Sequence, residues 1–160
     1  MDHTATPATT RYEALLQLLR AADAIWNASR VFFQEWDLSP SQFNVLNLLH
    51  SCPEGLSQSD LGRQLITHRS NVTGLVDRLE ARGLVQRMEV KNDRRAYRVV
   101  LTQAGSALLS QILPHYYKKA DQVWERVSSG RISELLLALD LVARNASGVV
   151  RDSPRKEALQ

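Results

Sequence analysis

The chain has 160 residues, of which 44% are apolar, and its 20 basic and 17 acidic side chains give a formal net charge of +3. This length suits one domain, or one compact lobe with helical extensions, and the apolar fraction is sufficient for a hydrophobic core. Cys52 is the only cysteine, which excludes an intramolecular disulfide, and the most apolar run, 135–143, is too short to cross a bilayer. The N-terminus has no basic segment followed by an apolar one, so we expect a cytoplasmic protein without a membrane partner.

The first third of the chain is expected to be helical. Residues 1–10 are small and polar and are expected to be frayed, whereas apolar residues recur at spacings of three and four over 11–36. This apolar stripe is wider than one neighbouring helix requires, so a second subunit is a candidate for part of its burial. Ser39 followed by Pro40 then predicts the N-cap and first position of another helix, which ends near Cys52.

Two short helices are expected in the centre of the chain. Ser57 is a suitable N-cap for a helix over 58–65, with Asp60 placed favourably toward the helix dipole. The next helix is expected over 69–81, and Gly83 supplies its stop.

The pattern then changes from helical to strand-like. Residues 84–90 have a strand-like pattern, and residues 97–101 alternate and contain β-branched side chains. The charged segment 91–95 between them suits a hairpin tip. Thr102 is expected to cap a helix that runs to about Val127, with Pro114 near a kink, and a last helix is expected over 131–149. Two short helices followed by a basic hairpin predict a mainly α-helical fold with a small β wing, a winged helix-turn-helix.

The positive charge is concentrated in one segment. Residues 61–98 contain nine basic and four acidic side chains, a local charge of +5, whereas the remainder has eleven basic and thirteen acidic ones, or −2. A local basic excess is typical of proteins that bind nucleic acid, although a solvated charged face would produce the same imbalance.

The helix over 69–81 has the residue types expected for duplex DNA. Its apolar side chains lie on one face of a helical wheel, and its polar ones lie opposite or at the flanks: Arg69, Ser70, Asn71, Thr73 and Arg78. Hydroxyl and amide groups contact base edges or phosphates, and arginine forks onto guanine or a phosphate. At the hairpin tip, Arg94 and Arg95 suit a minor groove, while Asp93 is placed to pair with one of them. A solvated hairpin tip is the alternative.

Residues 38–108 resemble the multiple antibiotic resistance regulators, the MarR family. The match rests on LSPSQFNVLNLL, SQSDLGRQL, RSNVTGLVDRLEARGLVQR and NDRRAYRVVLTQAG. The resemblance implies a DNA-binding domain over 38–102 and a homodimer held by intertwined helices over 11–36 and 103–149. It places Ser70, Asn71, Thr73 and Arg78 in the recognition helix and Asp93 and Arg95 in the wing motif. His68 departs from the pattern, in which a stronger N-cap is frequent, so that this helix begins at either Thr67 or His68.

The resemblance also implies a function in transcription. Such regulators bind pseudo-palindromic operators in double-stranded DNA, are most commonly repressors, and in many cases leave DNA when a small aromatic acid or phenol binds. Side chains suited to such an effector are Tyr12, Trp26, Arg30, Trp36, His50, Tyr116 and Tyr117, each equally explained by core or dimer packing.

Other classes of function receive less support. The sequence has no glycine-rich phosphate loop, no paired acid and base motif and no metal-ligand spacing, so we expect neither an enzyme nor a cofactor or metal site. Cys52 is interpreted as a small packed residue. A helical interaction module and an architectural DNA binder without ligand response remain the alternatives to a ligand-controlled regulator.

Overall fold

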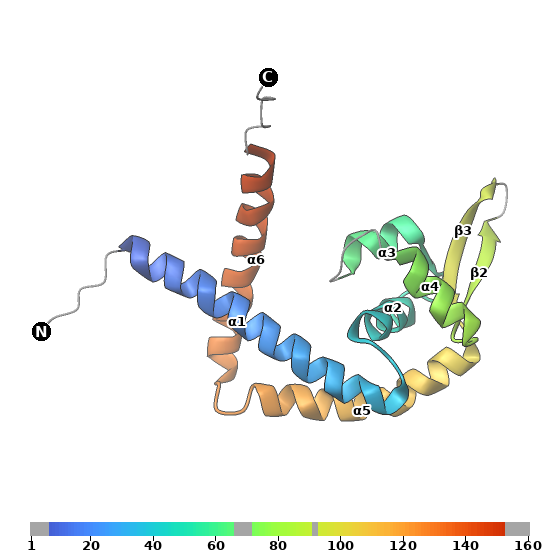
Figure 1. The fold of residues 1–160 in the computed structure, drawn as a ribbon, viewed down its shortest axis with the longest axis horizontal. Helices are drawn as coiled ribbons and strands as arrows, with labels where there is room; N and C mark the ends of the chain where they lie inside the picture. Colours follow the sequence, from blue (N-terminus) through green and yellow to red (C-terminus); the bar gives the residue numbers. More distant parts are fainter. Residues whose placement is uncertain (1–6, 66–71, 91–92, 153–160) are drawn as a thin grey trace, which may run out of the picture. The chain divides into compact units, whose positions relative to one another are not determined.

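A computed structural model describes the backbone of residues 7–65, 72–90 and 93–152, and the side chains of residues 10–65, 72–89 and 97–148. Figure 1 shows its elements, which are α1 (Pro7–Phe33), η1 (Gln34–Trp36), α2 (Pro40–His50), β1 (Leu56–Ser57), α3 (Gln58–Gln64), α4 (Val72–Ala81), β2 (Val85–Val90), β3 (Asp93–Leu101), α5 (Gln103–Val123) and α6 (Ser129–Asp152). The fold is mainly α-helical with a small β wing, as the sequence predicts.

The chain forms two compact units, Met1–Leu113 and Pro114–Gln160, and their boundary falls inside α5. The predicted division of labour, with DNA binding over 38–102 and dimerisation in the flanking helices, is a functional division and stays a prediction. None of the helices in the described residues has the length and apolar character required to span a membrane.

The hydrophobic core of the first unit is built around α2 and α4. Its buried side chains come from the end of α1, from α2 to α4, from the sheet and from the first half of α5: Phe33, Leu38, Phe43, Val45, Leu46, Leu49, Leu61, Leu65, Val72, Leu75, Val76, Leu79, Leu84, Val85, Val99, Leu109 and Ile112. The rings of Phe33 and Phe43 stack with centroids 4.3 Å apart, which joins α1 to α2. The apolar face predicted for α4 is therefore the buried one.

The sheet has three antiparallel strands in the order β1-β3-β2. β2 and β3 pair regularly from Val85 opposite Leu101 to Glu89 opposite Tyr97, and β1 pairs Leu56 with Val99. β1 has only two residues, too few to show the alternation by which strands are recognised, so the sequence does not predict it.

Predicted caps begin three of the helices. The backbone N–H of Gln42 donates to Ser39 Oγ (3.2 Å), and the backbone N–H of Ser39 donates to Gln42 Oε1 (2.8 Å), which completes a capping box. Ser57 Oγ accepts from the backbone N–H of Asp60 (3.1 Å), and Thr102 Oγ1 accepts from that of Gly105 (3.0 Å). These caps confirm the helix starts expected at Ser39, Ser57 and Thr102.

Helix ends differ from the expectations at both ends of the chain. α1 begins at Pro7 rather than at Arg11, because proline is favourable in the first helical turn and the small residues after it tolerate a helix. η1 replaces the last turn expected for that helix, since Asp37 adopts a left-handed conformation (φ 52°) after it. These differences leave the central helices unaffected.

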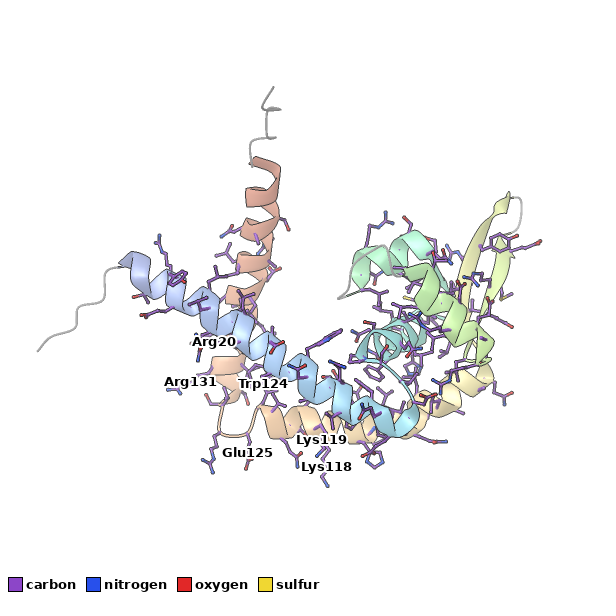
Figure 2. The ribbon with its side chains drawn as sticks, in the orientation of Figure 1. Arg20, Lys118, Lys119, Trp124, Glu125 and Arg131 are labelled. Atoms are coloured by element: carbon purple, nitrogen blue, oxygen red, sulfur yellow. The ribbon has the colours of Figure 1, made fainter. Side chains whose placement is uncertain are left out.

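The turn between α5 and α6 lies earlier than expected. α5 ends at Val123 rather than Val127, because Arg126 is left-handed (φ 68°), and α6 begins at Ser129 with Ser128 Oγ facing the backbone N–H of Arg131 (3.5 Å). Figure 2 shows the last part of α5 before this turn, from which Lys118 and Lys119 project. Gly130 therefore lies in the first turn of α6, which begins before the start at 131 that the sequence predicts.

Gly105 occupies a position with no room for a side chain. A Cβ there would lie 2.1 Å from the carbonyl oxygen of Leu84 and 2.9 Å from Leu101 Cδ1, whereas a Cβ at Gly130 would meet nothing within 4 Å. We expect Gly105→Ala to lower the free energy of unfolding by about 1–3 kcal/mol, because the start of α5 must move away from the sheet. Urea denaturation measures this effect. Gly130→Ala is the control and should keep or raise stability, so equal effects at the two glycines would contradict the proposed steric cause.

Candidate nucleic-acid interface

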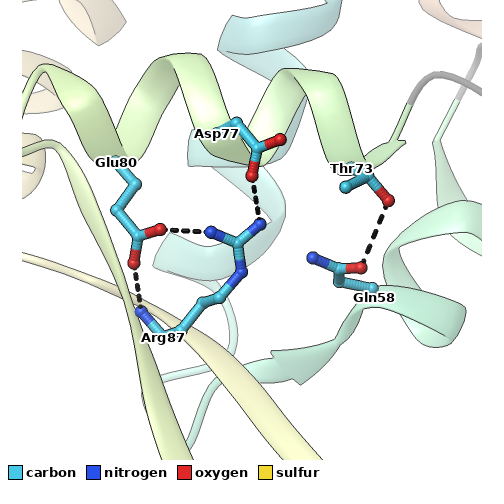
Figure 3. Close-up of polar contacts among 5 residues, drawn as sticks. All are labelled: Gln58, Thr73, Asp77, Glu80 and Arg87. Atoms are coloured by element: carbon cyan, nitrogen blue, oxygen red, sulfur yellow. Dashed lines mark hydrogen bonds and ion pairs between the residues drawn. The ribbon is translucent and has the colours of Figure 1, made fainter.

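α3 and α4 form the helix-turn-helix pair of the first unit. The hydroxyl of Thr73, at the start of α4, donates to Gln58 Oε1 at the start of α3 (3.4 Å; Figure 3). Residues 66–71 lie outside the described residues, and with them Arg69, Ser70, Asn71 and the choice between Thr67 and His68 as N-cap. Those assignments stay predictions.

The outer face of α4 presents polar groups to solvent. Thr73, Asp77 and Arg78 are exposed, on the side of the helix opposite its buried apolar residues. Within the described part of the chain, the side chain of Arg78 makes no hydrogen bond or ion pair, so its guanidinium is available to an external partner. Asp77 differs from Arg78 in that its carboxylate forms an ion pair with an arginine of the protein.

Arg87 on β2 binds two carboxylates on α4 (Figure 3). Its Nη2 lies 2.5 Å from Asp77 Oδ1, its Nη1 donates to Glu80 Oε2, and its backbone N–H donates to Glu80 Oε1 (2.9 Å). The hydrogen bond that Arg87 donates to Asp77 is the largest cause that raises the pKa of Arg87, and Glu80 adds to it against the opposing effect of burial. α4 and the wing are thus joined by a charged cluster.

Three more arginines of the basic segment are bound to the protein itself. Arg82 donates to the backbone carbonyl of Asp37 and to that of Trp36 (3.2 Å), and therefore ties the end of α4 to the segment between α1 and α2. Arg98 donates to the carbonyls of Glu54 and Gly55 (3.2 Å each). Arg63 pairs with Asp60. With Arg87, four of the nine basic residues counted in 61–98 have partners inside the fold.

The second strand of the wing is longer than the sequence predicts. β3 begins at Asp93, so residues 93–95, expected in the hairpin tip, belong to a strand. The pairing shifts from Glu89 opposite Tyr97 to Val90 opposite Asp93, which leaves residues 94–96 without a partner position on β2. The segment 91–95 is charged and lacks the alternation of apolar and polar residues by which strands are recognised, so the sequence does not predict a strand there. The side chains of Asp93, Arg94 and Arg95 lie outside the described ones, and their roles stay predictions.

A small pocket lies where α1 meets α2. Its volume is about 300 Å³, and it is lined by Arg30, Gln34, Asp37, Leu38, Ser39, Pro40 and Gln42. Of the side chains that the sequence analysis considered for an effector, Arg30 contributes to this wall. The backbone carbonyl of Asp37 is also the acceptor for Arg82, so one residue borders the pocket and contacts the end of α4.

The residues for which side chains are described contain no group of three or more His, Cys, Asp or Glu placed to hold a metal ion. Cys52 is half-buried and carries a free thiol.

Comparison with known proteins identifies relatives across most of the chain. A family model described as "MarR family" matches residues 38–97. The transcriptional repressor YetL of Bacillus subtilis is 30% identical over 117 residues, which are 72% of this chain and 70% of that protein. The transcriptional regulator FarR of Neisseria gonorrhoeae is 30% identical over 129 residues, which are 81% of this chain and 86% of that protein.

A solved structure has the same fold. The regulator AbsC of Streptomyces coelicolor, a MarR family member, superposes with a TM-score of 0.78 at 23% sequence identity, covering 92% of this chain and 99% of that one. At this identity the likeness establishes the fold, while the family follows from the relatives at 30%.

Ionised Asp60 stabilises the start of α3. The Ser57 hydroxyl donates to Asp60 Oδ2 (2.6 Å), and this bond, followed by the one from Arg63, lowers the pKa of Asp60 below its ordinary value. A carboxylate with a lowered pKa contributes stability that is present above its unfolded-state pKa of about 4 and is lost as the pH falls through the folded-state pKa.

We therefore expect Asp60→Asn to lower the melting temperature at pH 6, and the gap to the wild type to close toward pH 3. Thermal unfolding of both proteins from pH 3 to pH 6 measures it. A gap that is constant across this range would exclude ionised Asp60 as the source.

Proposed function

Because the chain belongs to the MarR family of DNA-binding transcriptional regulators, we propose that it is a homodimeric repressor. In this proposal the dimer dissociates from its operator when a small ligand binds to it. It is a regulator rather than an enzyme, as its relatives are. The observation that carries the proposal is the two-sided α4: the apolar face is buried in the core, and the opposite face exposes Thr73 and an unpartnered Arg78 within the described residues. Because the proposed operator lies on the chromosome, the protein is proposed to act in the cytoplasm.

α4 is proposed to enter the major groove. Thr73 and Arg78, with Ser70, Asn71 and Arg69 before them, would contact base edges and phosphates. Arg94 and Arg95 are proposed to contact the adjacent minor groove, because the β2–β3 hairpin leaves the C-terminal end of α4 and extends past the start of that helix in the view of Figure 1. Asp93 would orient one of these arginines. The arginines bound within the fold are proposed to support these contacts rather than make them.

A second copy of the chain is proposed to cover the apolar faces of α1 and α6. Each helix exposes large apolar side chains: Tyr12, Leu15, Leu19, Ile25 and Val31 on α1, and Leu135, Leu136, Leu137, Leu141 and Val142 on α6. Exposed apolar surface of this extent marks an interaction site. A homodimer would also present two recognition helices to the two halves of a pseudo-palindromic operator.

Repression and ligand response have separate supports. YetL, a relative at 30% identity, is a repressor by name. The pocket at the start of α2 contains a cationic side chain, Arg30, suited to an aromatic carboxylate. A ligand that displaces Asp37 there would also move the carbonyl that holds Arg82, and hence the end of α4.

Fluorescence anisotropy with a duplex selected by the protein from a random pool, and with a scrambled duplex, tests DNA binding. We expect preference for the selected duplex and steep salt dependence. Arg78→Ala should cost about 1–3 kcal/mol on the selected duplex and less on the scrambled one, and Arg95→Ala should reduce the salt slope by about one. Arg144→Ala is the control, since it removes an arginine paired with Asp140 on α6.

Each alternative has its own outcome in this assay. Equal binding to both duplexes would favour an architectural binder, and absence of binding at low salt would favour an interaction module. Salicylate added to the complex tests release, and a binding constant that does not change with salicylate would remove an aromatic acid of this class as the effector.

Sedimentation velocity tests the dimer. We expect a mass about twice the 18.0 kDa of one chain. Leu137, which is 75% exposed on α6, is the side chain to change. Leu137→Glu should weaken association at least tenfold, because it places a charge in an apolar interface. Met88→Glu on the wing is the matched control and should leave the mass unchanged; dissociation by both, or a wild-type monomer at micromolar concentration, would contradict the proposal.

A further inference from the structure

The outer side of α4 carries two carboxylates, which is unfavourable for a helix that approaches the phosphates of DNA. Asp77 directly precedes Arg78, and its side chain is 56% exposed. Glu80 lies three positions further and therefore projects from a neighbouring part of the same surface. Ionised carboxylates close to phosphates repel them, and the repulsion grows where water is excluded. Such carboxylates weaken DNA binding by the helix unless a nearby cation neutralises their charge.

Arg87 is placed to supply that compensation. It comes from β2 and reaches α4 with both terminal nitrogens, one to Asp77 and one to Glu80, while its backbone N–H donates to Glu80 as well (Figure 3). Its side chain is only 25% exposed, so most of the guanidinium faces the protein. On the opposite strand, β3 pairs Val99 with Arg87, and that valine is fully buried. The cluster is thus anchored on one side in the hydrophobic core.

The shape of the guanidinium explains why arginine occupies this position. Two terminal nitrogens at a fixed separation bind two different carboxylates at once, which a single ammonium group on a flexible stem does with less geometric definition. The result is a cross-link between the recognition helix and the first strand of the wing.

We propose that Arg87 is a positioning residue for DNA recognition, which neutralises Asp77 and Glu80 and fixes the wing relative to α4 without touching DNA itself. This inference rests on the proposed function, in which α4 and the wing contact adjacent grooves. Their relative placement then determines which spacing of major-groove and minor-groove contacts the protein accepts. Arg87 therefore contributes to sequence preference from a position between the two reading elements.

The test compares Arg87→Gln, the double variant Asp77→Asn with Glu80→Gln, and the triple variant that combines them. Dissociation constants are measured on the selected and scrambled duplexes over a range of salt, and thermal unfolding establishes that each variant is folded. Arg144→Gln, which breaks an exposed ion pair on α6, is the control for loss of one paired arginine. If the Arg87→Gln variant does not fold, the Arg87→Lys variant replaces it. Lysine keeps the positive charge but lacks the two terminal guanidinium nitrogens that bind both carboxylates.

We expect Arg87→Gln to weaken binding to the selected duplex about tenfold and binding to the scrambled duplex less, because two carboxylates are exposed to phosphates and the wing is loosened. In the triple variant, removal of both charges should recover most of the affinity. Arg87→Lys should keep the affinity for scrambled DNA and lose part of the preference for the selected duplex.

Three results would overturn the inference. A triple variant as weak as Arg87→Gln, with the salt slope reduced by about one, would assign Arg87 a direct phosphate contact. Unchanged binding by folded Arg87→Gln would remove any role. Equal losses on both duplexes that follow the loss of folded protein would show a purely structural role. Failure of the wild type to bind either duplex would instead overturn the proposed function itself, and this inference with it.

Discussion

The burial of one face of α4 is the constraint on which the rest of the recognition surface depends. Val72, Leu75, Val76 and Leu79 are each at most 4% exposed, and complete burial of one such side chain contributes about 1.5–3 kcal/mol. A rotation of α4 about its axis would expose these groups and bury polar ones, so the helix is held in one orientation. Thr73, Asp77 and Arg78 face solvent for that reason.

The described arginines of the basic segment fall into two groups, those that have acceptors inside the protein and Arg78, which has none within the described part of the chain. Arg82 and Arg98 reach backbone carbonyls at two chain turns, and Arg63 and Arg87 reach carboxylates. Arginine suits both tasks, since its five donors satisfy acceptors that would otherwise be poorly paired. The formal charge of the segment therefore overstates what is available to DNA, and Arg78 represents the available group among the described side chains.

The same polar contacts also tie together segments that are distant in sequence. Arg82 connects the end of α4 to Trp36 and Asp37. At the start of α5, Thr102 Oγ1 donates to the carbonyl of Gly83 (2.6 Å), which follows α4. Asp37 also borders the pocket lined by Arg30, so the guanidinium of Arg82 connects the α1–α2 junction to the end of α4.

Local signals in the sequence determined the helices, the caps and the two faces of α4. Ser39, Ser57 and Thr102 act through the nearest backbone groups, and the apolar period of α4 is a property of that helix alone, so both are visible in the order of residues. Only the tertiary structure decided which arginines are free, that β1 joins the sheet, and that Arg87 binds Asp77 and Glu80. Those outcomes depend on segments that the core brings together although they lie seven to 46 residues apart in the sequence. Neither the charge of a segment nor the spacing of its residues along the chain indicates such contacts.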